Sequence, residues 1–265
     1  MRKKFILVVL IGLLSSSLQA QDFALQRLEK SPRHHEWVTV KNGERVVHSF
    51  LVFPEVKNKA TAVVVIHENR GLTDWVRSVA DQLAEAGYIA IAPDLLSGMA
   101  PNGGKTSDFP TGDAAREAIS KVTPEQANAD LNAVTDYVAK LPAANGKVAV
   151  AGFCWGGRQS FRFATYRADL KAAFVFYGSG ADSSDIPKIN CPVYGFYGGN
   201  DARVNATIPK TAELMKAAGK RFEPVTYDGA GHGFMRAGEE PEATEANKKA
   251  RDEGWVRWKT LLKKI

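Results

Sequence analysis

One short stretch constrains the fold of this chain more than any other. Residues 148–157 read Val-Ala-Val-Ala-Gly-Phe-Cys-Trp-Gly-Gly. The apolar first half predicts a buried strand, and a helix is predicted from Trp155 to about Tyr166. Glycines two residues before and two residues after Cys154 remove the Cβ atoms that would collide in a sharp strand-to-helix turn. The spacing Gly-x-Cys-x-Gly is therefore typical of a nucleophile elbow, which presents a reactive side chain above the end of a strand.

The same turn bears on the chemistry of the thiol. The positive N-terminal end of a helix lowers a thiol pKa, so we expect Cys154 to be free and unusually acidic. A buried structural cysteine in a glycine-rich turn is the alternative. The other cysteine, Cys191, lies at the start of a later predicted strand. Because that position is at the opposite edge of a parallel sheet, we expect no disulfide, and a redox pair would lack a Cys-x-x-Cys motif.

Buried strands and amphipathic helices alternate along most of the chain. Continuous apolar runs predict strands that are buried on both faces, at 62–67, 88–93, 172–177 and 191–197. This alternation predicts the α/β class, with a doubly wound, mostly parallel sheet, helices on both faces and a single domain. The pair Asn42-Gly43 predicts a hairpin turn between antiparallel edge strands. Residues 99–112, rich in Gly, Pro, Ser and Thr, are expected to form a lid, a pocket wall or a disordered surface loop.

The N-terminus has the pattern of a secretory signal peptide. A basic start is followed by a short apolar segment and by small residues before Gln21. The apolar segment is too short to span a membrane comfortably. We therefore expect a cleaved signal peptide at 1–20, one domain at 21–265, and a periplasmic or secreted protein without a stable membrane anchor.

Charge and composition exclude several classes of function. The formal net charge is +6, and half of that excess comes from Arg2, Lys3 and Lys4 of the predicted signal peptide. The other basic residues are scattered, so nothing indicates nucleic-acid binding. His34 and His35 are adjacent and cannot easily share one metal ion, so solvated loop residues are the better interpretation. The sequence indicates no oligomeric state.

Three chemically capable side chains follow the ends of predicted strands, namely Cys154, Asp201 and His232. The carboxyl ends of parallel strands meet at one edge of a sheet. The order nucleophile, acid, histidine is that of the α/β-hydrolase triad. His232 would accept the thiol proton, and Asp201 would orient His232 and stabilise its charged form. The oxyanion hole is expected from the backbone N–H groups of Trp155 and Asn69.

Each of these residues has a simpler interpretation when taken alone. Asp201 could close a turn in Gly-Gly-Asn-Asp, and His232 could be an ordinary loop residue. Ser179 is a rival nucleophile, but it lacks the elbow spacing.

At these residues the sequence resembles the dienelactone hydrolase (carboxymethylenebutenolidase) family of the α/β-hydrolase superfamily. The matching stretches are 67–71, 92–95, 152–157, 197–201 and 231–234. The resemblance implies an α/β-hydrolase fold and a Cys-His-Asp triad that cleaves a small ester or lactone through a thioester. It implies neither a metal nor an organic cofactor.

The resemblance also assigns roles to residues around the triad. Glu68 matches a glutamate that contacts the resting cysteine and moves as substrate binds, which helps to form the thiolate. Arg236 matches an arginine that binds the substrate carboxylate. The second carboxylate-binding arginine of the family has no match at 96–98, where Leu-Ser-Gly stands, although Arg70 could replace it. The simpler interpretations are a solvated loop carboxylate for Glu68 and a surface residue for Arg236.

The expected partner is thus a small-molecule ester or lactone. The alternatives are a broad-specificity carboxylesterase or thioesterase with the same triad, and a non-catalytic ligand-binding protein that retained the fold.

Overall fold

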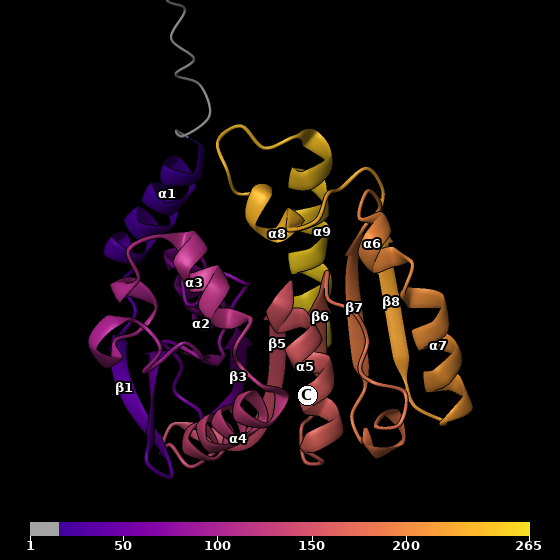
Figure 1. The fold of residues 1–265 in the computed structure, drawn as a ribbon, viewed down its shortest axis with the longest axis horizontal. Coiled ribbons are helices and arrows are strands. Elements are labelled where there is room, and N and C mark those ends of the chain that lie inside the picture. The colour runs from indigo at the N-terminus through magenta and orange to yellow at the C-terminus, as the bar shows by residue number, and fades with distance from the viewer. Residues whose placement is uncertain (1–15) are drawn as a thin grey trace, which may run out of the picture.

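The computed structural model describes residues 16–265, which build one eight-stranded sheet with helices around it (Figure 1). The strand order is β1-β2-β4-β3-β5-β6-β7-β8. Strands β3 to β8 run parallel to one another, whereas β2 pairs antiparallel with both β1 and β4. The strands are β1 (His35–Asn42), β2 (Arg45–Val52), β3 (Ala60–Ile66), β4 (Ile89–Pro93), β5 (Ala144–Phe153), β6 (Ala173–Phe176), β7 (Val193–Gly198) and β8 (Phe222–Tyr227). The expected mostly parallel α/β sheet is confirmed.

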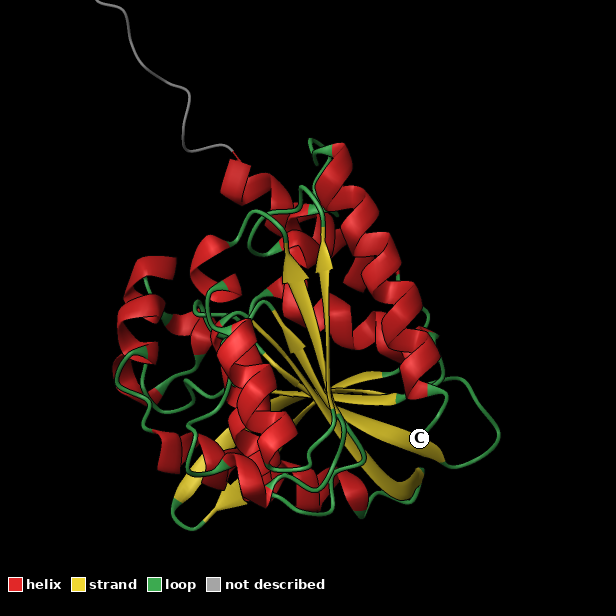
Figure 2. Cartoon of the chain, turned by 90° about the vertical axis from the view of Figure 1, so that its right-hand side faces the viewer, coloured by secondary structure: helices red, strands yellow, loops and turns green. Residues whose placement is uncertain are grey.

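Helices cover both faces of the twisted sheet (Figure 2). One apolar core lies between the sheet and the helices α1 (Ser16–Lys30), α2 (Asp74–Glu85), α8 (Phe234–Ala237) and α9 (Glu245–Leu262). A second core lies on the opposite face, under α4 (Pro124–Ala139), α5 (Trp155–Tyr166) and α7 (Ile208–Ala217). The central strands are buried on both sides because helices cover both faces, which explains their continuous apolar runs.

Local sequence signals mark the hairpin turn between β1 and β2 and the start of α4. Gly43 has a φ of 59° in the hairpin turn, where Asn42 pairs with Arg45. The Thr123 side chain accepts a hydrogen bond from the Gln126 amide at 3.2 Å and so caps α4. The hairpin turn depends on neighbours in sequence, which is why the sequence alone predicted it.

Helices α1 and α3 (Gly112–Ile119) are among the elements that were not expected from the sequence. Helix α1 buries little apolar surface beyond Ala24 and Leu28. Its first residues belong to the predicted signal peptide, the rest of which (1–15) lies outside the described residues. Helix α3 begins at the end of the 99–112 segment. From Ser16 to Ile265, no helix is long and apolar enough to cross a membrane.

The 99–112 segment is not a disordered loop. It contains the 3-10 turns η1 (Pro101–Gly103) and η2 (Thr106–Asp108). The buried carboxylate of Asp94 accepts hydrogen bonds from the backbone N–H and the hydroxyl of Thr106, both at 2.7 Å. The Thr106 hydroxyl in turn accepts the Leu72 amide at 3.0 Å. The segment is therefore hydrogen-bonded to the chain that follows β3 and to the chain that follows β4. It forms a fixed wall at this edge of the sheet rather than a free lid.

Candidate active site

Cys154 occupies a strained turn between β5 and α5. Its backbone has φ 56° and ψ −112°, a region that side-chain-bearing residues rarely adopt. The Cys154 amide donates to the Phe176 carbonyl at 3.0 Å, and its own carbonyl accepts the Arg158 amide at 3.2 Å. These bonds fix the turn between a strand end and a helix start, which is the geometry of a nucleophile elbow.

The flanking glycines are required by space as well as by backbone freedom. A Cβ on Gly152 would lie 1.9 Å from the Gly156 carbonyl oxygen, and one on Gly156 would lie 2.4 Å from the carbonyl oxygens of Ile66 and His67. The elbow therefore packs directly against the end of β3. This close approach brings the loop after β3, which carries Glu68 and Asn69, next to Cys154.

His232 and Asp201 form a pair at the same edge of the sheet. Their side chains are joined by a hydrogen bond of 2.5 Å between His232 Nδ1 and Asp201 Oδ2. Asp201 is 6% exposed, and its other oxygen caps the short helix α6 (Ala202–Asn205) by accepting the Val204 amide at 3.3 Å. With Nδ1 donating to Asp201, the neutral imidazole keeps Nε2 free to accept a proton. No hydrogen bond joins the Cys154 thiol to His232 in the described part of the chain.

Glu68 is part of a second polar cluster beside the elbow. Its carboxylate accepts a hydrogen bond from Arg236 Nε at 3.2 Å and one from the Tyr177 hydroxyl at 3.4 Å. Arg236 also donates to Glu240 at 2.7 Å. Glu68 and Arg236 are thus paired with each other beside the elbow, and neither is an unpartnered surface group.

The thiol is less acidic than expected in this arrangement. Burial raises the pKa of Cys154, and the negative charge of Glu68 raises it further. The backbone N–H groups of Trp155 and Asn69 act in the opposite direction but do not offset the rise. Our expectation of an acidic thiol, which rested on the helix N-terminus and on a nearby His232, is wrong for this conformation because burial and the neighbouring carboxylate raise the thiol pKa.

The same two amides are the ones expected in the oxyanion hole. Both the Trp155 and the Asn69 N–H groups act on the Cys154 sulfur, so they face the place where a carbonyl carbon would be attacked. The loop that carries Asn69 is held by His67, which is fully buried, stacks on Trp155 at 5.5 Å and accepts the Leu95 amide at 3.2 Å. Burial lowers the pKa of His67, so this ring is neutral and serves as a rigid support.

Arg70 is not brought to the Cys154 cluster by any contact in the structure. Its guanidinium lies 4.0 Å from Asp113, and its side chain runs along Gly112. It lines an open groove of about 660 Å³ together with Arg77, Lys105 and the 99–112 segment. The role of Arg70 as a replacement carboxylate clamp is therefore not supported.

Sequence reasoning missed two residues near the elbow. Tyr177 follows β6, has φ 40°, is 1% exposed, and its ring meets that of His232 edge-on at 5.1 Å. Burial and the Glu68 charge raise its pKa well above the ordinary value, so the phenol stays a hydrogen-bond donor. Arg203, on α6 just after Asp201, is exposed, makes no ion pair among residues 16–265, and acts electrostatically on Cys154. Tyr177 directly follows β6, and Arg203 lies two residues after the predicted acid Asp201. These positions near the carboxyl ends of strands are the signal that could have found them.

The two cysteines, the rival nucleophile and the histidine pair considered from the sequence can also be located in the structure. Cys154 and Cys191 are both free thiols, as expected. Ser179 lies in the loop after β6. The interpretation of His35 as a solvated loop residue is wrong, because His35 lies in β1 and its ring is hydrogen-bonded to the Asp81 carboxylate of α2 at 2.8 Å. The described residues contain no group of three or more His, Cys, Asp or Glu placed to hold a metal ion.

Structural neighbours share this fold. A structure from Klebsiella pneumoniae described as "Putative Dienelactone Hydrolase" superimposes with a TM-score of 0.77 at 24% identity, covering 88% of this chain and 99% of that chain. A dienelactone hydrolase-like promiscuous phosphotriesterase from metagenomic libraries superimposes with a TM-score of 0.75 at 21% identity, covering 88% and 98%. At these identities the similarity demonstrates the fold alone.

Similarity in sequence identifies the family as well as the fold. The family model described as "Dienelactone hydrolase family" matches residues 47–265. A Salmonella typhimurium protein named "Putative carboxymethylenebutenolidase" is 33% identical over 207 residues, which cover 74% of each chain. The carboxymethylenebutenolidase of Pseudomonas putida is 28% identical over 207 residues, which cover 76% of this chain and 86% of that protein. The chain is therefore a hydrolase that belongs to the dienelactone hydrolase family.

Proposed function

We propose that this protein cleaves a small ester or lactone through a Cys154–His232–Asp201 triad and a thioester intermediate. The observation that carries the proposal is the strained elbow at Cys154, with φ 56°, at the same sheet edge as the 2.5 Å pair of His232 and Asp201. A cysteine nucleophile, a histidine base and an acid that orients the histidine are the parts that acyl transfer requires.

The chemistry follows from the placement of these groups. The Cys154 proton passes to His232, and the sulfur attacks the acyl carbon while the Trp155 and Asn69 amides stabilise the oxyanion. Collapse breaks the acyl C–O bond, and His232 returns its proton to the leaving oxygen, which stays tethered to the acyl group if the substrate is a lactone. Water, deprotonated by His232, then hydrolyses the thioester and restores the thiol.

Glu68 would couple thiol activation to substrate binding. In the resting arrangement, burial is the larger cause of the raised pKa of Cys154 and the Glu68 charge is the second. Glu68 itself is held by hydrogen bonds of 3.2 Å from Arg236 and 3.4 Å from Tyr177. A substrate carboxylate that takes its place on Arg236 would move Glu68 away from the thiol, which would lower the pKa of Cys154 and let its proton pass to His232. The free thiol would then be protected until substrate arrives.

This proposal favours an acyl substrate that carries a carboxylate. Arg236 offers planar donors to such a group, and Arg203, which makes no ion pair in the described residues, supplies a second cation near Cys154. Arg203 would do this in place of the family arginine that has no match at 96–98.

A broad-specificity carboxylesterase is the second candidate. It is favoured by the two carboxylates, Glu68 and Glu240, that already occupy Arg236. If Arg236 stays occupied by them, neutral esters would be cleaved as well as anionic ones.

We also propose that the protein acts in the periplasm or outside the cell as a domain of residues 21–265. The support is the basic start, short apolar segment and small residues before Gln21. This proposal is independent of the chemistry.

Hydrolysis of chromogenic esters and lactones by the purified protein, with Cys154→Ala as the control, tests the catalytic proposal. We expect activity in the wild type, none in Cys154→Ala, and an acyl adduct on Cys154 in rapid-quench mass spectrometry. Retained activity in Cys154→Ala would exclude a cysteine nucleophile. The absence of both turnover and adduct would favour a non-catalytic ligand-binding protein.

The charge preference is tested by comparing an anionic lactone with its neutral methyl ester. A charge-assisted hydrogen bond contributes about 1.5–3 kcal/mol, so Arg236→Ala should lower kcat/KM for the anionic substrate about ten- to a hundredfold. The neutral ester should be affected little. Equal discrimination by wild type and variant would identify the protein as a general esterase.

A further inference from the structure

We propose that the N-terminal helix α1 is part of the substrate-binding wall and that its Arg27, acting through Glu239, positions Arg236 beside the thiol. The inference rests on the proposed function, since it concerns the residue proposed to bind the substrate anion. Helix α1 precedes the family match at 47–265, so this contribution is an addition to the part of the chain that the family shares.

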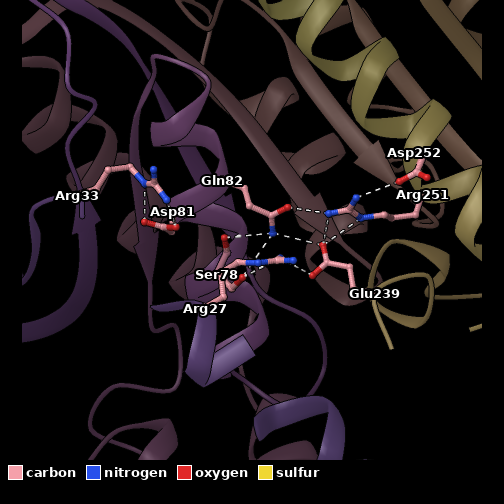
Figure 3. Close-up of polar contacts among 8 residues, drawn as sticks. All are labelled: Arg27, Arg33, Ser78, Asp81, Gln82, Glu239, Arg251 and Asp252. Carbon is pink, nitrogen blue, oxygen red and sulfur yellow. Dashed lines mark hydrogen bonds and ion pairs between the residues drawn. The ribbon is translucent and has the colours of Figure 1, made fainter. Parts of the chain in front are cut away.

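Glu239 is the point where several elements converge (Figure 3). Arg27 of α1 donates to its carboxylate at 2.7 Å, and Arg251 of α9 donates at 2.8 Å. Gln82 of α2 adds a hydrogen bond of 3.3 Å and also accepts from Arg251 at 2.8 Å. The Glu239 side chain is 5% exposed. A buried carboxylate with two guanidinium partners is held firmly because any movement would leave charge unpaired.

Glu239 lies next to the substrate-facing residues. Its backbone N–H donates to the Arg236 carbonyl at 3.0 Å, and the following residue, Glu240, binds the Arg236 guanidinium at 2.7 Å. Arg236 in turn reaches Glu68 at 3.2 Å. The chain of contacts therefore runs without a gap from Arg27 through Glu239 and Arg236 to the carboxylate that acts on Cys154.

Helix α1 also borders Arg236 directly. Phe23 lines a narrow hollow together with Trp75, Arg236, Glu239 and Glu240. The Arg27 guanidinium lies over the Phe23 ring at 4.9 Å, so the residue that binds Glu239 also supports the wall beside Arg236.

The segment after α1 is anchored separately. The fully buried carboxylate of Asp81 accepts hydrogen bonds from Arg33 at 2.7 Å and 2.8 Å and from Ser31 at 2.6 Å (Figure 3 shows the Arg33–Asp81 pair). Loss of Arg27 should therefore disturb the Glu239 loop while the chain beyond α1 stays attached. This separation makes Arg27 a suitable site for a point substitution.

The test compares how fast Cys154 is alkylated by iodoacetate, an anion, and by neutral iodoacetamide. In both reactions the thiolate displaces iodide and forms a C–S bond, so the ratio of the two rates cancels the fraction of thiolate. The ratio reports the positive charge near the sulfur and requires no hydrolysis. If no ester or lactone is cleaved, the proposed function fails while this measurement still decides the role of Arg27.

We expect Arg236→Ala to lower the iodoacetate-to-iodoacetamide ratio about tenfold. Arg27→Ala should lower it in the same direction by about threefold or more, and Arg27→Lys should restore most of the loss. Lys30→Ala, an exposed residue of the same helix turn, should leave the ratio unchanged. In the double variant Arg27→Ala/Arg236→Ala the ratio should equal that of Arg236→Ala, because the two residues act on one path.

The proposal is overturned if Arg27→Ala lowers the urea midpoint of unfolding but leaves the ratio at the wild-type value, because Arg27 would then only hold the helix. It is also overturned if Arg27→Ala lowers the ratio as much in the Arg236→Ala background as in the wild type. If Arg27→Ala does not yield folded protein, Arg27→Met provides the same comparison, since it keeps the apolar length of the side chain but cannot donate to Glu239.

Discussion

The backbone of Cys154 predicts that glycine is better tolerated than alanine at this position. With φ 56° and ψ −112°, a residue with a Cβ atom pays about 1–3 kcal/mol of conformational strain. Glycine avoids that strain but loses about 0.5–1 kcal/mol more backbone entropy on folding. Because Cys154→Gly and Cys154→Ala both lack the sulfur, their difference isolates these two effects. We expect the free energy of unfolding of the glycine variant to exceed that of the alanine variant by about 0.5–2 kcal/mol.

Urea unfolding of the two variants under identical conditions measures this difference. The matched control is Ala129→Gly in the middle of α4, where the backbone is helical and glycine should cost about 1 kcal/mol. The two sites should therefore respond to glycine with opposite signs. A glycine variant at position 154 that is no more stable than the alanine variant would refute the assignment of strain to the elbow.

Three further predictions concern the thiols and the N-terminus. Burial, and to a smaller extent the charge of Glu68, raise the pKa of Cys154. The pH at which its alkylation rate is half-maximal should therefore lie above the usual thiol pKa of about 8.5, and Glu68→Gln should lower that pH. An unchanged pH in Glu68→Gln would show that the thiol does not sense Glu68. Burial raises the pKa of Cys191 to about 12 in the folded protein. Because the thiol of the unfolded chain loses its proton at a lower pH, the free energy of unfolding should fall as pH rises from about 9 toward 12. Between about pH 8 and pH 10, wild type should lose more free energy of unfolding than Cys191→Ala, and parallel losses would contradict this. Exported protein should have the intact mass of a chain that begins at Gln21, whereas a mass that includes residues 1–20 would oppose cleavage.

The nucleophile elbow was predictable because its glycine spacing is a pattern over a few residues. A Cβ on Gly152 would collide with the carbonyl of Gly156 in the same turn, whereas a Cβ on Gly156 would collide with the end of β3, a contact that only the structure reveals. The alternation of apolar strands and amphipathic helices was readable for a similar reason, since burial on both faces leaves strands apolar throughout. The placement of Cys154, Asp201 and His232 at one edge then followed from the rule that carboxyl ends of parallel strands share an edge.

The environment of the thiol was not predictable from its neighbours in sequence. A helix N-terminus favours a thiolate, but the carboxylate that opposes it is Glu68, whose position depends on the packing of β3 against the elbow. Tyr177 was missed because a tyrosine after a strand looks like core, and its hydroxyl gains a role only beside Glu68. Arg70 was placed near the triad by its neighbour Asn69, whereas the structure turns it toward Asp113.

Sequence by itself determined the sheet, the elbow and the order of the catalytic candidates, because these depend on periodicity and on glycine spacing over a few residues. Tertiary structure alone decided how the site is supported. Helix α1 buries little apolar surface and is held by charge, with Arg27 reaching Glu239 across 212 positions of the chain. Arg236 likewise meets Glu68 across 168 positions. Ion pairs leave no periodic pattern in a sequence, since a charged residue looks the same whether it faces water or a partner brought close only by folding.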